Sequence, residues 1–287
     1  MASLREIRTH ITGVQKTQQI TRALKMVAAV KLRHAQENLL QAVPYSERIK
    51  EVIGHISNHV EKNFHPLLAI REPKRIGYII VTADQGLCGS FNQNIIRRAE
   101  LEIRQHPEQD IFTIVIGKRG WDYFKKSAYR NLSNYTGFFK DLNFVHASTI
   151  ASLIMDFYIT GSLDQFLLIY NEFKSATNQN VVVEQLLPIQ PVAIRTETKV
   201  SELLLEPNKI GVVENVCLQY LNVYIWRVLL ESFASEMAAR MTAMEYATEN
   251  AETLLTDLKT QFNRRRQENI TNEILEIVGG SEVLREK

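Results

Sequence analysis

Cysteine is scarce in this sequence: among 287 residues there are only Cys88 and Cys217, far apart along the chain. Two thiols are too few for a disulfide framework or for a cluster of thiolate metal ligands. We therefore expect both cysteines to be buried as ordinary apolar side chains. A reducing compartment fits this composition, because disulfides persist mainly in oxidising ones.

Long apolar runs and a strong net charge are also missing. No uninterrupted apolar stretch approaches the roughly 18 residues that a membrane-spanning helix needs, and the N-terminus has no apolar signal-peptide core. The formal net charge is +2, so the chain as a whole has no general electrostatic attraction for nucleic acid. The sequence predicts neither a membrane span nor a nucleic-acid partner.

Catalytic motifs are absent as well. The chain contains no GxSxG, HExxH or paired-cysteine motif, and its seven histidines are scattered. His55 and His59 have the spacing of two ligands on one helix face, but no third ligand stands near them in the sequence. We therefore predict no catalytic residue, no metal site and no cofactor.

The C-terminal segment, residues 209–287, is predicted to be one very long helix. From Val212 to Val278 it contains neither glycine nor proline, which allows about 100 Å of helix. A helix of this length cannot be buried along its whole length in a small domain, so it indicates a rod. Its seam follows a heptad pattern: Leu230, Met237, Met241, Met244, Thr248, Ala251, Leu255, Leu258 and Phe262.

The N-terminal segment, residues 1–59, has a similar pattern. Ser3 is a good N-cap and Glu6 completes a capping box. Apolar positions repeat at Leu4, Ile7, Ile11 and Val14, and again at Ala28, Leu32, Ala35, Leu39 and Ala42. Between them the seam is polar at Gln18, Thr21 and Lys25, whereas the apolar residues move to Ile20, Leu24 and Val27. This change of face predicts a different partner at that level.

Residues 75–208 between the two helices are predicted to form an α/β domain. Strand-like runs at 76–82, 112–117, 166–173 and 180–187 alternate with helical segments at 91–104, 121–126 and 148–160. Such alternation favours a mainly parallel, Rossmann-like sheet covered on both faces. The last two strands are close enough in sequence to form an antiparallel hairpin at one edge.

The two terminal helices are expected to pair. One runs toward the central domain and the other runs away from it, so they would form an antiparallel two-helix coiled coil. Residues 1–34 carry seven basic side chains and one acidic one, whereas residues 231–287 carry eleven acidic and seven basic side chains, and this difference in sign favours pairing. Because the C-terminal helix is longer, its apolar end would be a single helix that a partner must enclose.

Two motifs leave other functions open. DQGLCGSFN (Asp84–Asn92) stands between a strand and a helix, where an enzyme of this fold class would hold a phosphate, but it matches neither GxGxxG nor GxxxxGK[ST]. A tight turn is the preferred interpretation. The basic run Arg264–Arg266 is typical of a solvated helix face, and an acidic protein partner suits it better than nucleic acid, which would need interleaved aromatic residues.

Several long motifs resemble one family. IRTHITGVQKTQQITRALKMVAAVKL near the N-terminus, DQGLCGSFN in the middle, and SEMAARMTAMEYATENA and NRRRQENITNEILEIVGGSEVL near the C-terminus are similar to the gamma subunit of F-type ATP synthase, in its bacterial form. The resemblance covers the whole chain. Leu24 departs from it, since methionine is common there, and the cysteine-bearing insertion of the chloroplast form is absent.

The resemblance implies a non-catalytic rotary shaft. The coiled coil would turn inside a hexamer of alternating alpha and beta subunits, and the α/β domain would be a foot that binds the epsilon subunit and the membrane ring of c subunits. Ion flow through that ring would drive the shaft, which forces the beta subunits through their nucleotide states. The expected location is peripheral, on the cytoplasmic face of the cell membrane.

The resemblance also assigns residues. Arg240, Gln267 and Thr271 match positions that contact beta-subunit loops, with Leu24 and Lys25 opposite them. The chain end, represented by Ile277, Val278, Val283 and Leu284, would turn in an apolar sleeve that acts as a bearing. Replacement of Arg240 by alanine is expected to weaken coupling with little loss of folding, on the premise that an exposed charge contributes modestly to stability.

Overall fold

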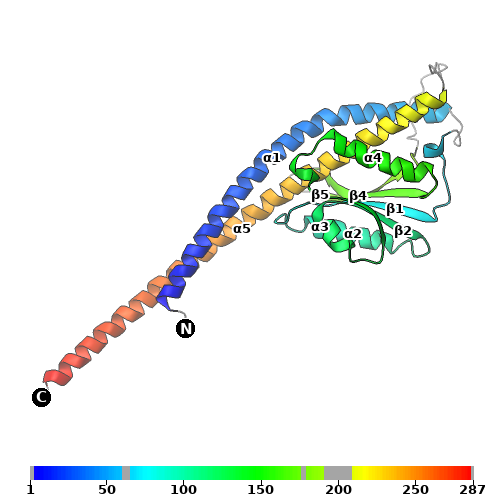
Figure 1. Ribbon diagram of the computed structural model, residues 1–287. Coiled ribbons are helices and arrows are strands. Elements are labelled where there is room, and N and C mark those ends of the chain that lie inside the picture. Colours follow the sequence, from blue (N-terminus) through cyan, green and yellow to red (C-terminus); the bar gives the residue numbers. More distant parts are fainter. Residues whose placement is uncertain (1–2, 60–64, 176–178, 191–208, 286–287) are drawn as a thin grey trace. The chain divides into compact units, whose positions relative to one another are not determined.

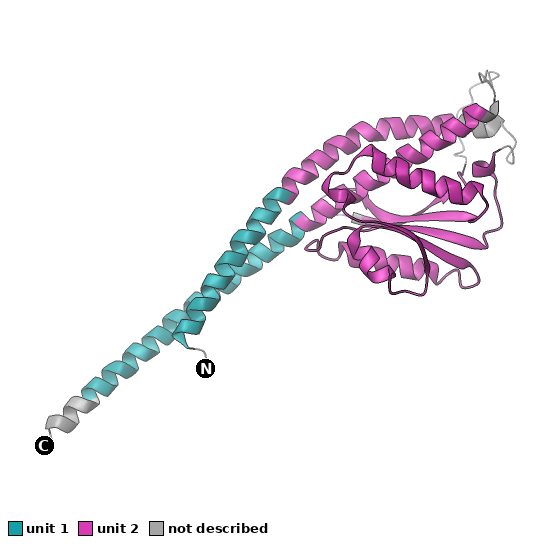
Figure 2. Ribbon diagram, in the orientation of Figure 1, with its two compact units in different colours: residues 1–27, 241–287 teal, residues 28–240 magenta. Residues whose placement is uncertain are grey.

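The computed structural model describes residues 3–59, 65–175, 179–190 and 209–285, with side chains described except at 55–59, 179, 209–210 and 279–285. Two compact units are distinguished in Figure 2. The first, which we call the shaft unit, comprises residues 1–27 and 241–287. The second, the foot unit, comprises residues 28–240.

The first helix, α1, spans Leu4–His59. Its capping box is present as predicted: the Glu6 carboxylate accepts a hydrogen bond from the Ser3 backbone N–H at 2.8 Å, and the Ser3 hydroxyl accepts one from the Glu6 N–H at 3.2 Å. These two bonds satisfy N–H groups that otherwise have no helical partner. The helix continues through Pro44.

The last helix, α5, spans Lys209–Arg285 without interruption. The predicted heptad seam is largely confirmed, because six of its nine members are buried: Leu230, Met237, Met244, Ala251, Leu255 and Leu258. The helix also continues through Gly279 and Gly280, which lie beyond the glycine-free run that defined it in the sequence.

Within each unit the two terminal segments lie antiparallel, as predicted. In the shaft unit, Thr21 contacts Thr248 and Lys25 contacts Glu245, so the numbering falls along one helix as it rises along the other. In the foot unit, Ala35 lines a cavity with Leu230 and Ala42 lines one with Val223, which is the same antiparallel sense. Figure 2 shows the paired segments in each colour.

A five-stranded sheet forms the centre of the foot unit, in the order β3-β2-β1-β4-β5. The first four strands in this order are parallel, and β5 is antiparallel to β4, which confirms the mainly parallel sheet and its edge hairpin. The strands are β1 (Arg75–Val81), β2 (Asp110–Ile116), β3 (Arg130–Tyr135), β4 (Gln165–Phe173) and β5 (Gln179–Leu187).

Helices cover both faces of the sheet (Figure 1). One face packs against α4 (Phe144–Ile159) and against buried residues of α5 such as Leu221 and Leu229. The other packs against α2 (Phe91–Ile103) and α3 (Lys118–Phe124). Alternation along β1 explains the two cores, since Ile79 belongs to the first and Ile80 to the second.

One strand was missed in the sequence. Strand β3 has the sequence RNLSNY and is mostly half-buried. It is an edge strand, so one side of its backbone pairs with β2, and Leu132 and Tyr135 are the side chains that pack against the apolar core. Short 3-10 helices at Pro66–Leu68 and Phe138–Lys140 complete the described elements. Of the helices described, none is long and apolar enough to cross a membrane.

Candidate functional site

A polar layer interrupts the apolar seam of the shaft unit. Thr21 is 8% exposed, and its hydroxyl lies 2.8 Å from that of Thr248. The Lys25 ammonium lies 2.5 Å from the Glu245 carboxylate, with both side chains about two-fifths exposed. The seam therefore stays on one face of α1 and is polar at Thr21 and Lys25, as the sequence indicated.

The apolar residues at this level of α1 lie on a face other than the seam. Ile20 is 60% exposed and Val27 is 53% exposed, whereas Leu24 is half-buried. Met26 beside them is also exposed. Because large apolar side chains at successive turns of one helix face solvent, this face fits the predicted contact with a different partner.

Gln267 and Thr271 lie farther along α5 and are exposed. The Thr271 hydroxyl donates to the Gln267 carbonyl at 2.9 Å, within the helix. Gln267 follows Glu245 by 22 positions, or roughly 33 Å along a helix. The structure therefore places Gln267 and Thr271 at a different level of the shaft from Lys25 and does not bring them together.

The neighbouring basic run is partly neutralised within the helix. Arg264 and Arg265 both contact the Glu268 carboxylate, at 3.2 and 2.8 Å. The hydrogen bond from Arg265 lowers the pKa of Glu268 below its ordinary value. These ion pairs between residues one helical turn apart weaken the positive electrostatic field that would attract nucleic acid. This agrees with the interpretation of the basic run as a solvated helix face.

The far end of α5 has no helix beside it among the described residues of the shaft unit. Every residue from Thr271 to Val278 is exposed, including Ile274 and Ile277 at 55% and 71%. The predicted bearing residues Ile277 and Val278 are thus exposed apolar side chains on a single helix. The side chains of Val283 and Leu284 lie outside the described residues.

Arg240 occupies a different environment from the one expected. It is 8% exposed, and its guanidinium lies 2.6 Å from the Glu236 carboxylate. It also donates to the backbone carbonyl of Gly86 at 3.1 Å. The premise that Arg240 is an exposed charge is therefore wrong: it is a buried, ion-paired residue that fastens α5 to the loop after β1. Burial raises the pKa of Glu236 despite this cation, which is its principal counter-charge.

The loop that Arg240 holds is the DQGLCGSFN motif, and it is the predicted tight strand-to-helix turn. Leu87 adopts a φ of 62° and is 65% exposed, so the turn holds a bulky residue in the left-handed region at a cost of roughly 1–3 kcal/mol. Asn92 stabilises the turn by accepting the Ala83 backbone N–H at 2.9 Å. Nothing in the sequence indicated that Leu87 would have a positive φ.

Asp84 explains why this turn is not a phosphate site. In a sheet of this order, ligands bind where the strand order reverses, here between β1 and β4. The Asp84 carboxylate accepts backbone N–H groups from Lys118 at 3.0 Å, Gly137 at 2.9 Å and Phe139 at 3.4 Å. These bonds tie the turn to the segments that follow β2 and β3, and the Asp84 charge would repel a bound anion.

Metal and thiol chemistry have no visible site in the described residues. No group of three or more His, Cys, Asp or Glu residues is close enough to hold a metal within that part of the chain. The side chains of His55 and His59 lie outside it. Cys88 and Cys217 are both free and buried, as predicted. Burial raises the pKa of Cys217 to about 12 and that of Cys88 above its usual value, so neither is a reactive thiolate.

Comparisons with known proteins give one consistent result. A family model described as "ATP synthase" matches residues 3–284. The chain is 42% identical over 292 residues to the ATP synthase gamma chain of Chlorobaculum parvum, with all of both chains covered.

Solved structures agree at the level of the fold. A mitochondrial ATP synthase central stalk and c-ring structure from Tetrahymena thermophila contains a chain that is 25% identical, with a TM-score of 0.62 over 79% of this chain and 99% of that one. A chain from the Euglena gracilis enzyme has a TM-score of 0.71 at 21% identity, over 98% of this chain and 94% of that one.

Proposed function

The chain belongs to the ATP synthase gamma-chain family, and from this premise we propose how its two units divide the work of a central rotary shaft. The shaft couples ion flow through a membrane ring to ATP synthesis or hydrolysis in the beta subunits. It is a non-catalytic subunit, because the catalytic sites lie in those beta subunits. The single observation that carries the proposal is α5, an unbroken helix from Lys209 to Arg285 that runs through both units.

The family defines the partners as the alpha and beta subunits of the hexamer, the epsilon subunit and the ring of c subunits. The Tetrahymena structure comprises a central stalk together with a c-ring, and the chain matched in it covers most of this one. The protein is a peripheral part of a membrane complex. We propose the cytoplasmic face of the cell membrane as its location.

Three functional segments are proposed along the chain. Residues 1–59 and 209–287 are assigned to the coiled coil, and residues 75–208 to a central α/β domain that would meet epsilon and the c ring. All five strands and the helices α2, α3 and α4 fall within the last range, which supports assigning it to binding rather than to the coiled coil.

Contacts with the beta subunits are assigned to Leu24, Lys25, Gln267 and Thr271. Exposed polar groups at Gln267 and Thr271, and a half-exposed ammonium on Lys25, support this assignment. An acidic beta loop would compete with Glu245 for Lys25. The beta subunits would therefore contact the shaft at two levels, because Gln267 lies roughly 33 Å along the helix axis from Glu245, the partner of Lys25.

For Arg240 the proposed beta contact is more restricted. Its guanidinium already binds the Glu236 carboxylate and the Gly86 carbonyl. A beta-subunit group would therefore reach Arg240 only by replacing one of these contacts. Contact between Arg240 and a beta subunit would then change the conformation of the turn that contains Leu87. Arg240 would in this way couple beta-subunit contact to the foot unit.

The bearing is assigned to Ile277, Val278, Val283 and Leu284. Exposed apolar groups at the first two positions support it. Apolar contacts are non-directional, whereas hydrogen bonds depend steeply on angle and would hold a turning shaft at preferred orientations.

A rotation assay tests the proposed function. The hexamer of alpha and beta subunits would be fixed to a surface, and a probe would be attached to the foot through an exposed position such as Lys126. Addition of ATP should produce unidirectional stepping of the probe. Hexamers assembled without this chain provide the control, and an ATP-hydrolysing complex whose probe never steps would contradict the proposal.

A further inference from the structure

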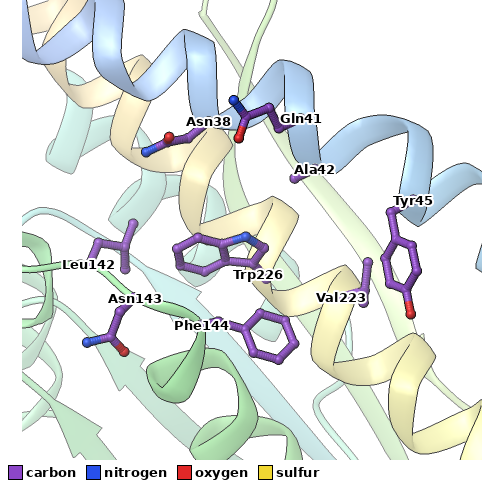
Figure 3. A pocket seen from close by; sticks show the side chains of 9 residues that line it. All are labelled: Asn38, Gln41, Ala42, Tyr45, Leu142, Asn143, Phe144, Val223 and Trp226. Carbon is purple, nitrogen blue, oxygen red and sulfur yellow. The ribbon is translucent and has the colours of Figure 1, made fainter.

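A cavity of about 390 Å³ opens in the foot unit where α1, α5 and the start of α4 meet. Each element contributes one face, as Figure 3 shows. The lining residues are Asn38, Gln41, Ala42 and Tyr45 from α1, Leu142 and Asn143 before α4, Phe144 at its first position, and Val223 and Trp226 from α5. A volume above roughly 300 Å³ is in the range of small-ligand pockets.

Aromatic side chains dominate this lining. Phe144 and Trp226 meet edge to face, with ring centroids 6.1 Å apart and an interplanar angle of 77°. Tyr45 faces them from α1 and is 54% exposed. Because none of the lining side chains carries a formal charge at neutral pH, a flat aromatic ring would bury its faces here without desolvating an ion.

Polar groups that could orient such a ring stand at the rim. Asn38 and Gln41 are exposed, and Figure 3 shows both amides on the α1 side of the cavity. A small number of precisely placed polar groups among apolar walls is typical of sites that bind an amphipathic small molecule.

A second cavity of about 210 Å³ continues from the first, with Asn38 and Leu142 lining both. It carries two ammonium groups, Lys31 and Lys140, against the single carboxylate of Asp141. Lys31 also lies within the field of Glu236, whereas Lys140 is exposed at the end of the 3-10 helix Phe138–Lys140. The second cavity is also lined by Phe139 and Phe233, so the combined groove is aromatic and uncharged at one end and carries basic groups beside aromatic rings at the other.

We propose that this groove binds a small molecule composed of a flat aromatic ring and one anionic group. The ring lies between Tyr45, Phe144 and Trp226, and the anion faces Lys140. The site is separate from the proposed beta-subunit contacts and does not depend on the rotary role. It joins α1 to α5 and α4, so a bound ligand stabilises the foot unit by mass action.

The test uses 2-naphthoate, with 2-naphthamide as its uncharged analogue, titrated into the purified full-length chain. Trp226 is one of two tryptophans, so replacing Trp121 by phenylalanine leaves its emission as the only indole signal. A ligand of this size should bind with a Kd on the order of 0.1–1 mM. We expect the acid to bind about 3–10 times more tightly than the amide, and its advantage to shrink as salt is raised.

Two variants locate the ligand. Ala42→Phe fills the aromatic cavity from a half-exposed helix position and should abolish binding of both compounds. Lys140→Gln should leave amide binding unchanged and remove the advantage of the acid. Lys126→Gln, an exposed lysine of the same unit, is the matched control and should behave like the unmodified chain.

Three results would overturn the proposal. The first is the absence of any Trp226 emission change up to about 10 mM ligand, roughly ten times the upper end of the expected Kd range. The second is unaltered binding to the Ala42→Phe variant with its fold intact by circular dichroism, which would place the ligand elsewhere. The third is equal loss of acid preference in the Lys140→Gln and Lys126→Gln variants, which would reduce the effect to net charge.

Discussion

Arg240 shows how far one residue's environment can differ from its appearance in a helix pattern. In sequence it is a charge on a long helix, but in the fold it binds a carboxylate and a carbonyl that belongs to a residue 154 positions away. The Glu236 contact follows the i,i+4 rule and was accessible to sequence reasoning. The Gly86 contact was not, because it depends on how the foot unit packs against α5.

For Arg240→Ala we therefore expect a loss of about 3 kcal/mol in the free energy of unfolding, because the variant leaves Glu236 as a buried carboxylate without its cation. Urea unfolding of the isolated chain measures this. ATP-driven rotation of the assembled complex should also lose coupling, as the family role predicts.

A double variant separates charge from packing. In Arg240→Leu combined with Glu236→Leu, no buried charge is left unpaired, so most of the lost stability should return. If Arg240→Ala unfolded within about 0.5 kcal/mol of the unmodified chain, the buried ion pair would not contribute as described.

Glu231 is a second buried acid on α5, 9% exposed and 3.6 Å from Arg227. Burial raises the pKa of Glu231, Arg227 opposes that shift, and the carboxylates of Glu172 and Glu184 on the facing strands reinforce it. Tyr170 from β4 completes the group around it. A carboxyl with a raised folded pKa binds its proton more tightly in the fold, so its stabilising contribution is lost as pH rises through that pKa.

Glu231→Gln should accordingly raise stability at neutral pH. The amide resembles the protonated acid, so we expect a gain of about 1 kcal/mol at pH 8. The gain should disappear below roughly pH 4.3, where the acid is protonated in both states. Urea unfolding at the two pH values measures it, with the exposed Glu249→Gln as control. A gain that is constant with pH would exclude a titration effect.

At the scale of elements, the paired terminal helices were the most predictable part. The capping box at Ser3 and the apolar seam of α5 depend on local chemistry and spacing, which a sequence contains directly. The sequence also showed that the seam is polar at Thr21 and Lys25, but it did not name their partners Thr248 and Glu245, because those depend on the register of the two helices. Strand β3 was missed, since a half-buried polar edge strand has a weak apolar pattern.

Lys25 has two possible roles: an ion pair with Glu245 within the shaft unit, and a contact with a beta-subunit loop. Exchange of the two charges distinguishes them. Lys25→Glu places two carboxylates together and should cost about 1 kcal/mol of unfolding free energy. Adding Glu245→Lys restores the pair and should return stability to its original value. Thermal unfolding of the isolated chain follows both changes.

In the assembled complex the exchanged pair should remain impaired. If Lys25 meets an acidic beta-subunit loop, a glutamate at position 25 repels that loop even though the shaft is stable. Full coupling of ATP hydrolysis to rotation in the exchanged variant would instead restrict Lys25 to a role within the shaft unit.

At the scale of the whole molecule, sequence reasoning recovered the antiparallel helix pair, the Rossmann-like sheet and the family. These depend on patterns that extend over many residues and tolerate local errors. The candidate contact residues are different, since each depends on a partner that is a separate chain. Exposure of Gln267, Thr271 and Ile277 fits such contacts without specifying them.

The C-terminal end of α5, which has no helix beside it in the described part of the shaft unit, leads to a prediction about the complete complex. Ile277→Ser with Val278→Ser should leave urea unfolding of the isolated chain unchanged within about 0.5 kcal/mol, because both side chains are exposed. Rotation against a viscous load should fall several-fold once the apolar bearing surface is lost. Leu101→Ser, an exposed apolar position on α2, should leave rotation unchanged. Equal slowing by both variants would argue against a bearing at the tip.

The boundary between the two units falls inside both long helices, after Val27 in α1 and after Arg240 in α5. There is consequently no loop at this boundary to act as a hinge. Any angular displacement between the units must be taken up by twisting and bending two hydrogen-bonded helices, which resist gradually and recover. We therefore expect such a connection to act as a torsional spring, which would store part of the work delivered at one end and release it at the other.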